Sequence, residues 1–145
     1  MNRRDSREAA LCMVFDYSFH NQDESEQQLE LYLENFHDEN SKNISEELRR
    51  DNYFTKAYFG VISNIPELDE IIDTHSKKWK SSRISRISRS ILRLALYEIK
   101  YMDDIPSEVS INEAVELAKK FDSDESYSFV NGILGAFVRS ADKVQ

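Results

Sequence analysis

Apolar residues recur every three or four positions along most of the chain, which is the spacing of one face of an α-helix. This pattern predicts about seven helices, over residues 5–19, 25–37, 45–64, 66–75, 85–101, 111–121 and 125–139. Pro66 suits the first turn of its helix, where the missing N–H is not needed. Ser110 followed by Glu113 fits a capping box, although Ser107 could begin that helix earlier. No segment makes a strong case for a strand.

Turn-forming residues are scarce between these segments. Only three Gly and two Pro occur in 145 residues, and all-β proteins need more turn residues than this. We therefore predict an all-α protein, with its helices in two small bundles packed into a single domain over residues 1–145. The composition changes from acidic to basic near Ser81-Ser82, which suggests sub-bundles of roughly 1–80 and 81–145.

Charge is distributed unevenly along the chain. The formal net charge is −8, from 19 Lys+Arg and 27 Asp+Glu, and this alone argues against binding nucleic acid. Residues 77–100, however, carry eight bases and one acid, whereas residues 21–51 carry ten acids and three bases. Because salt screens charges beyond about 10 Å, such local patches matter more than the total. The basic stretch could be a solvated face paired with the chain's own acids, or a surface for an acidic partner protein, and the two readings weigh evenly.

Short catalytic motifs are missing from the sequence. It has no phosphate-binding glycine loop and no H-E-x-x-H, and its three histidines lack the spacing of metal ligands. We expect no enzyme, no cofactor and no metal site. Cys12, the single cysteine, excludes a disulfide framework within one chain, and it falls on a predicted apolar face as a core thiol. Without a signal peptide or a run of about 20 apolar residues, we expect a cytoplasmic protein that does not meet a membrane.

Two groups of residues suit RNA. Arg3, Arg4 and Arg7 could share a helix face and bind phosphates, because a guanidinium donates two parallel hydrogen bonds; the alternative is a solubilising tail. Near the chain's end, aromatic side chains stand beside lysines and could stack unpaired bases; this second group is Lys119, Lys120, Phe121, Tyr127 and Phe129. Core packing is the better reading for Phe121 and Tyr127, whereas Phe129 falls at the edge of its helix face.

Longer motifs run through the chain in a fixed order: RR at 3–4, REAAL at 7–11, ILRLALYE at 91–98, DIP at 104–106, INEAVELAKKF at 111–121 and SYSFVNGIL at 126–134. Together they resemble the NusB family of bacterial transcription factors. The similarity extends over the whole chain, although residues 21–76 match only in helical pattern and length. It implies an all-helical fold of two bundles and an RNA-binding factor rather than an enzyme.

The resemblance also implies partners and site residues. NusB proteins pair with NusE, a small-subunit ribosomal protein, and the pair binds the boxA element of nascent RNA. It then joins other Nus factors on RNA polymerase, so that rRNA operons are transcribed past terminators. With the lysines of the second group, the implied RNA surface is Arg3, Arg4, Arg7, Phe15, Lys119, Lys120, Phe121, Glu125 and Phe129. The implied NusE surface lies on the helix over residues 86–101, near Ser88, Arg89, Arg93 and Tyr97.

Other interpretations stay open. A helical adaptor that binds protein and no RNA would tolerate replacement of Arg3, Arg4 and Arg7. A similar N-terminal domain occurs in an rRNA cytosine methyltransferase family, but 145 residues leave no room for the catalytic domain that would follow. Relatives can also self-associate and cover the RNA face, so a homodimer remains an alternative to a monomer.

Overall fold

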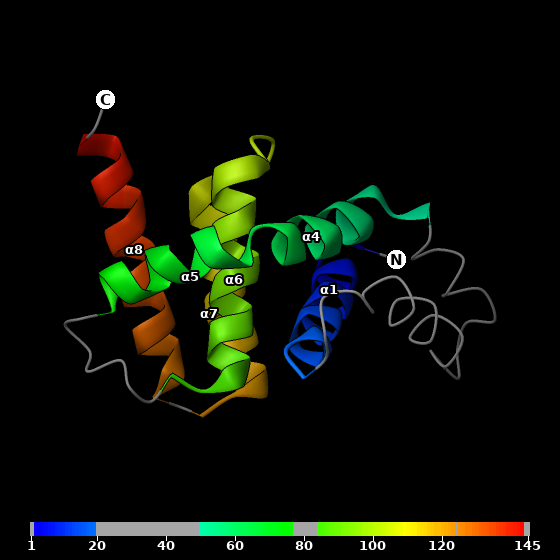
Figure 1. The fold of residues 1–145 in the computed structure, drawn as a ribbon, viewed down its shortest axis with the longest axis horizontal. Helices are drawn as coiled ribbons and strands as arrows, with labels where there is room; N and C mark the ends of the chain where they lie inside the picture. The colour runs from blue at the N-terminus through cyan, green and yellow to red at the C-terminus, as the bar shows by residue number, and fades with distance from the viewer. Residues whose placement is uncertain (1, 20–49, 77–83, 124, 144–145) are drawn as a thin grey trace. The chain divides into compact units, whose positions relative to one another are not determined.

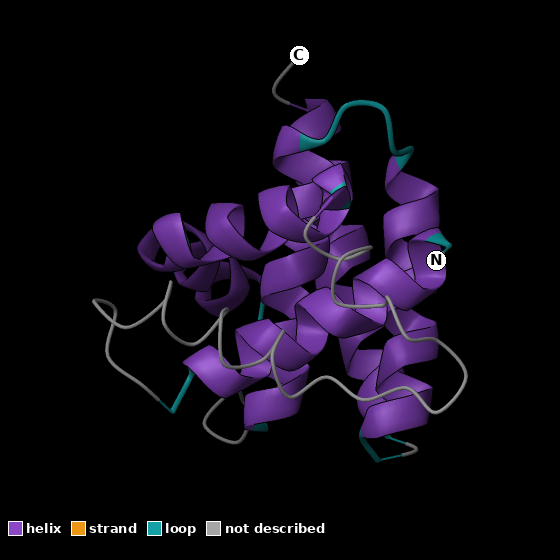
Figure 2. Cartoon of the chain, turned by 90° about the vertical axis from the view of Figure 1, so that its right-hand side faces the viewer, coloured by secondary structure: helices purple, strands orange, loops and turns teal. Residues whose placement is uncertain are grey.

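The structure, a computed structural model, describes residues 2–19, 50–76, 84–123 and 125–143 (Figure 1). Six helices form most of this part of the chain. These residues contain no strand (Figure 2), so the prediction of an all-α fold is confirmed. The helix expected over residues 25–37 lies outside the described residues, as does the expected break near Ser81-Ser82. Within the described ranges, every helix is too short or too polar to cross a membrane.

The chain divides into two compact units, Met1–Ser63 and Asn64–Gln145. In the first unit, α1 (Arg3–Tyr17) packs against α4 (Asn52–Ser63). Both helices turn small and apolar side chains inward at helical spacing, and the most buried are Ala10, Met13, Val14, Ala57, Tyr58 and Val61. Small residues at these positions let the two helices approach closely while larger ones fill the space between them.

Asp51 joins the two helices of this unit. It stands directly before α4, and its side chain accepts a hydrogen bond from the backbone N–H of Phe54 at 2.9 Å, as a residue that caps a helix does. The other carboxylate oxygen accepts a hydrogen bond from the hydroxyl of Ser6, which is buried in α1. One carboxylate therefore caps α4 and ties it to α1.

The second unit contains α5 (Ile65–His75), α6 (Arg86–Tyr101), α7 (Ser107–Phe121) and α8 (Ser126–Lys143). In Figure 1, α5 lies across α6 and α8, and it contacts both. Its buried side chains are Leu68 and Ile72, and the ring of His75 meets that of Phe137 edge-on at 6.0 Å. The change in composition near Ser81-Ser82 suggested that α5 belongs to the N-terminal sub-bundle. In the structure, α5 packs against α6 and α8 of the second unit.

The start of α7 differs from the predicted capping box. The helix begins at Ser107, directly after Pro106, whose carbonyl accepts from the backbone N–H groups of Val109 and Ser110. The Ser110 side chain is buried and donates to Glu98 of α6 at 3.0 Å instead of capping. The capping box at Ser110 is therefore not formed, and the helix begins at Ser107, the earlier start that the sequence also allowed.

Candidate functional site

The N-terminal arginines belong to the first two turns of α1, after the Asn2 cap. The guanidinium carbons of Arg3 and Arg7 lie 4.8 Å and 5.3 Å from the ring centroid of Tyr53 in α4. Arg7 is only 4% exposed, whereas Arg3 and Arg4 are exposed. These residues are therefore part of a packed helix rather than a tail, with Arg3 and Arg4 carrying the charge that solvent can reach.

Two aromatic rings meet near the C-terminal end of α1. Phe15 is half-buried and meets Phe19 edge-on, with centroids 5.2 Å apart. Cys12, three residues before Phe15, is exposed, so the prediction of a core thiol was wrong. The reason is angular: the buried face of α1 is centred on Ala10, Met13 and Tyr17, and position 12 lies well around the helix from it.

Two aromatic rings are exposed beside lysines at the α7–α8 turn, which we define as residues 119–129. Phe121 and Tyr127 are each 41% exposed. The ammonium of Lys119 lies 5.1 Å from the centroid of the Tyr127 ring, and that of Lys120 lies 5.3 Å from the Phe121 ring. Such distances are within the range of cation–π contacts. Core packing was therefore the wrong interpretation of both rings.

The exposure of these rings follows from their place in the helices. Phe121 ends α7 and Tyr127 belongs to the first turn of α8, beyond the fully buried Ala118 and Val130. Phe129 is half-buried, and Glu125 is exposed in the loop. Lys119 and Lys120 lie in the last turn of α7, where the helix dipole favours positive charge. Among its described residues, the α7–α8 turn thus combines two exposed rings, two lysines and the exposed carboxylate of Glu125.

Asp122 fixes the position of this turn against α6. One of its carboxylate oxygens accepts hydrogen bonds from the hydroxyl groups of Ser85, at 2.8 Å, and Ser88, and the other accepts from the N–H of Ser123 at 2.8 Å. Ser85 in turn caps α6 by accepting from the N–H of Ser88. Partial burial alone would raise the pKa of Asp122, but these hydrogen bonds lower it below its usual 3.8.

We expect Asp122→Ala to lower the free energy of unfolding by about 1–2 kcal/mol at pH 7, because hydrogen bonds to a charged acceptor are lost. Since the folded-state pKa is depressed, this contribution is complete above the usual value and disappears as the pH falls through the folded-state value. Urea denaturation at pH 7 and pH 3 measures the difference. The control is Asp103→Ala, which removes an exposed acid of the α6–α7 loop. Equal effects of the two substitutions at pH 7 would contradict the assignment.

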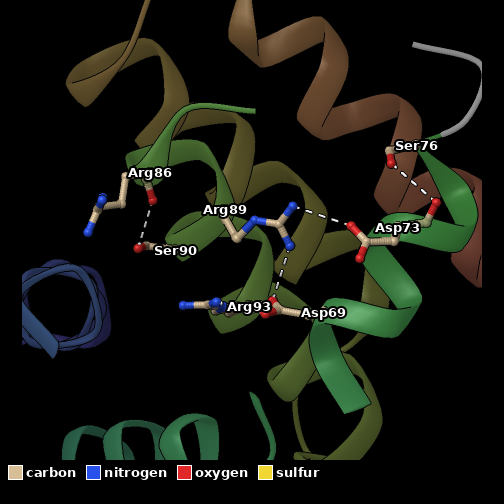
Figure 3. A network of polar contacts seen from close by, with 7 residues as sticks. All are labelled: Asp69, Asp73, Ser76, Arg86, Arg89, Ser90 and Arg93. Atoms are coloured by element: carbon tan, nitrogen blue, oxygen red, sulfur yellow. Dashed lines mark hydrogen bonds and ion pairs between the residues drawn. The ribbon is translucent and has the colours of Figure 1, made fainter. Parts of the chain in front are cut away.

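An ion-pair network joins α5 to α6 (Figure 3). Arg93 donates two hydrogen bonds of 2.8 Å to the two carboxylate oxygens of Asp69. Arg89 lies 3.3 Å from Asp69 and 3.3 Å from Asp73. Burial alone would raise the pKa of Asp69, but the hydrogen bonds and charges of Arg93 and Arg89 lower it. Arg89 and Arg93 thus pair with acids of the same chain, which is one of the two interpretations that the basic stretch left open.

A second polar cluster joins the first turn of α5 to the last turn of α6. Glu67 of α5 accepts hydrogen bonds from Lys100 and from the hydroxyl of Tyr101, and these lower its pKa. The Tyr101 ring lies 5.1 Å from that of Tyr97, which is largely buried. Ser88 is buried as well. Four residues were expected to meet a partner protein. Of these, Ser88 and Tyr97 are buried, and Arg89 and Arg93 form ion pairs with α5.

The acids of α5 were missed by sequence reasoning. A signal was available: Asp69 and Asp73 are four residues apart, as are Arg89 and Arg93, so each pair lies on one face of its helix. Among the described residues, every buried side-chain nitrogen and oxygen has a hydrogen-bond partner. The buried polar groups of both units therefore serve the fold, and the exposed ones are the candidates for binding.

Comparison with known proteins gives a consistent result. The model of the NusB family matches residues 4–139. The transcription antitermination protein NusB of Agathobacter rectalis is 44% identical over 137 residues, which cover 94% of this chain and 99% of that protein. Solved NusB from T. maritima is 35% identical, with a TM-score of 0.73 over 96% of this chain and 92% of that one. A crystal structure of the antitermination factors NusB and NusE in complex with dsRNA has a TM-score of 0.69 at 22% identity, over 95% of this chain and 96% of that one, and shares the fold.

Proposed function

The chain belongs to the NusB family, and on this basis we propose that it is an RNA-binding transcription antitermination factor. It would pair with a NusE protein, bind boxA in nascent rRNA transcripts and reach RNA polymerase with other Nus factors. The observation that carries the RNA role is the α7–α8 turn, where two exposed rings stand beside lysines. Unpaired bases are commonly recognised by stacking on such rings, while cations neutralise their phosphates.

Within the α7–α8 turn, each residue type suits one part of an RNA strand. The Phe121 ring offers a face for a base, and half-buried Phe129 offers an edge. Lys119 and Lys120 can reach phosphates on flexible stems. Glu125, exposed in the loop, can accept hydrogen bonds from base amino groups, which would distinguish bases by their edges. This division of roles is the one expected of a sequence-reading surface.

On α1, we assign phosphate contacts to Arg3 and Arg4 and a stacking contact to Phe15, which is half-buried. Arg7 is nearly covered, so its part is to hold the Tyr53 ring in place beside Arg3. On α6, the NusE surface would use the outer edge of Arg89, with Arg93, Ser88 and Tyr97 supporting the helix from within. A carboxylate on the partner could share Arg89 with Asp73, because that pair is exposed and long.

The decisive experiment titrates labelled boxA-like RNA and a scrambled RNA with the protein, with and without NusE, at two salt concentrations. We expect boxA-like RNA to bind more tightly, NusE to strengthen binding and salt to weaken it. If both RNAs bind equally weakly with NusE present, the RNA role is wrong. In that case binding of NusE alone would support a helical adaptor that contacts protein and no RNA.

The double substitution Arg3→Ala and Arg4→Ala is expected to weaken boxA binding and to flatten its salt dependence. Each lost phosphate contact lowers the slope of log K against log salt by about 0.7 for a single strand. The matched control is Arg50→Ala with Lys56→Ala, which removes two exposed cations from the same unit. Equal losses in both double variants would show that only total charge matters and would remove α1 from the RNA surface.

A further inference from the structure

Tyr127 is one of the two exposed rings of the α7–α8 turn, and the roles assigned to single residues above do not include it. It is as exposed as Phe121, at 41%, and both rings flank one short loop between α7 and α8. The fully buried side chains on the inner face of α8 include Val130 and Ile133, whereas Tyr127 in the first turn keeps 41% of its surface exposed. The ring therefore has a free surface on which a planar group can lie.

Lys119 gives this ring a second property. Its ammonium lies 5.1 Å from the Tyr127 centroid, and among the described residues it also forms a 3.8 Å ion pair with Glu116, one helical turn earlier. The side chains of that pair are 50% and 61% exposed, so the pair is worth little in water. Lys119 can thus turn from the ring to a phosphate at small cost. Phe121 has a comparable cation beside it, because the ammonium of Lys120 lies 5.3 Å from the centroid of the Phe121 ring.

We propose that Tyr127, together with Lys119, is a second stacking position of the α7–α8 turn, which receives an unpaired RNA base while Phe121 receives another. This inference rests on the proposed RNA-binding function and specifies the ligand of that site as a single strand with at least two unstacked bases. Stacking uses the faces of the base and the ring, so the tyrosine hydroxyl is not required. The lysine would move from the ring to the phosphate of the stacked nucleotide.

The test compares four full-length variants in the boxA titration with NusE present. Tyr127→Leu removes the ring and is expected to weaken binding about five- to hundredfold, the usual cost of losing one stacked base. Tyr127→Phe keeps the ring and should bind within about twofold of the wild type. Lys119→Gln should lower the salt slope by about 0.7.

Tyr101→Leu is the matched control, because the chain offers a second tyrosine of nearly equal exposure. Tyr101 is 40% exposed and has the ammonium of Lys100 5.6 Å from its ring centroid. It ends α6, whereas the α7–α8 turn is tied to the start of that helix through Ser85 and Ser88. A helix of 16 residues, about 24 Å long, separates the two tyrosines. We expect Tyr101→Leu to bind RNA like the wild type.

A spectroscopic measurement separates stacking from other contacts. RNA that carries 2-aminopurine at successive boxA positions should show a fluorescence change at one position that Tyr127→Leu abolishes and Tyr127→Phe keeps. Unchanged affinity and fluorescence for Tyr127→Leu, in a wild type that prefers boxA over scrambled RNA, would overturn this inference and leave the proposed function standing. Equal losses for Tyr127→Phe and Tyr127→Leu would also overturn it, since the hydroxyl would then carry the contact. A wild type that does not distinguish the two RNAs refutes the proposed function, and this inference falls with it.

Discussion

Replacing Ile91 with alanine is expected to lower the free energy of unfolding by about 2–5 kcal/mol, the range for truncating a large side chain in a packed core. Ile91 is fully buried in α6, and α6 contacts each of α5, α7 and α8. The substitution removes three carbons and leaves a cavity that helices held on three sides cannot easily fill. Urea denaturation followed by far-UV circular dichroism measures the loss as a lower midpoint at constant slope.

Ile99→Ala is the control for this prediction. It is the same substitution in the same helix, at a position that is only half-buried. Its effect should be less than half that of Ile91→Ala, because less apolar surface returns to water and solvent can occupy the space. Similar losses at the two positions would mean that α6 is not the centre of the second unit.

Replacing Asp69 with alanine is expected to cost about 2–3 kcal/mol. The Arg93 side chain is 12% exposed and that of Asp69 is 27% exposed, so their two 2.8 Å hydrogen bonds are largely shielded from water. Removing the carboxylate leaves Arg93 charged and poorly solvated, which is the costly way to break such a pair. Urea denaturation at pH 7 measures the effect, and a double-mutant cycle with Arg93→Met isolates the coupling between the two side chains.

Asp73→Ala provides the comparison within the same network. The Asp73 side chain is 64% exposed and has one 3.3 Å contact with Arg89, so its loss should cost less than about 0.5 kcal/mol. The two variants should also differ in acid. Because the pKa of Asp69 is lowered, its contribution is present at neutral pH and is lost as the pH falls through the folded-state value. A cost for Asp69→Ala that stays constant from pH 7 to pH 3 would contradict the ionic assignment.

Helix positions were predictable from apolar spacing because each helix buries one face. The clearest case is α6, expected over residues 85–101 and found at Arg86–Tyr101. The wrong predictions concern the exposure of single side chains, which depends on residues that are close in space but distant in the sequence. The Tyr127 ring is at plausible core spacing, yet the packing of the other helices leaves it exposed. Cys12 is exposed for a different reason, since it lies around α1 from the buried face. Periodicity defines a face of a helix, but not how far along the helix that face is covered.

Candidate binding residues were harder to predict, for a related reason. The resemblance to the NusB family placed Arg89 and Arg93 on a partner surface, and the charge pattern alone left pairing with the chain's own acids equally open. In the structure both arginines pair with Asp69 of α5. The spacing of four residues within each helix showed that the acids share one face and the arginines another, but it could not show that these two faces meet. The exposed rings of the α7–α8 turn were identified as a group, but which of them face solvent depends on where α7 ends and α8 begins.

The contact of Tyr53 with Arg3 and Arg7 has a consequence for the strength of the proposed phosphate binding. A free arginine loses roughly 2 kcal/mol of side-chain entropy when it is fixed on a ligand. Arg3 is already restrained against the Tyr53 ring, and that ring is in turn held by buried Arg7. Part of the ordering has therefore taken place during folding, so a phosphate bound there as proposed would meet a preorganised guanidinium. A buried arginine that never touches the ligand would in this way raise the affinity of an exposed one.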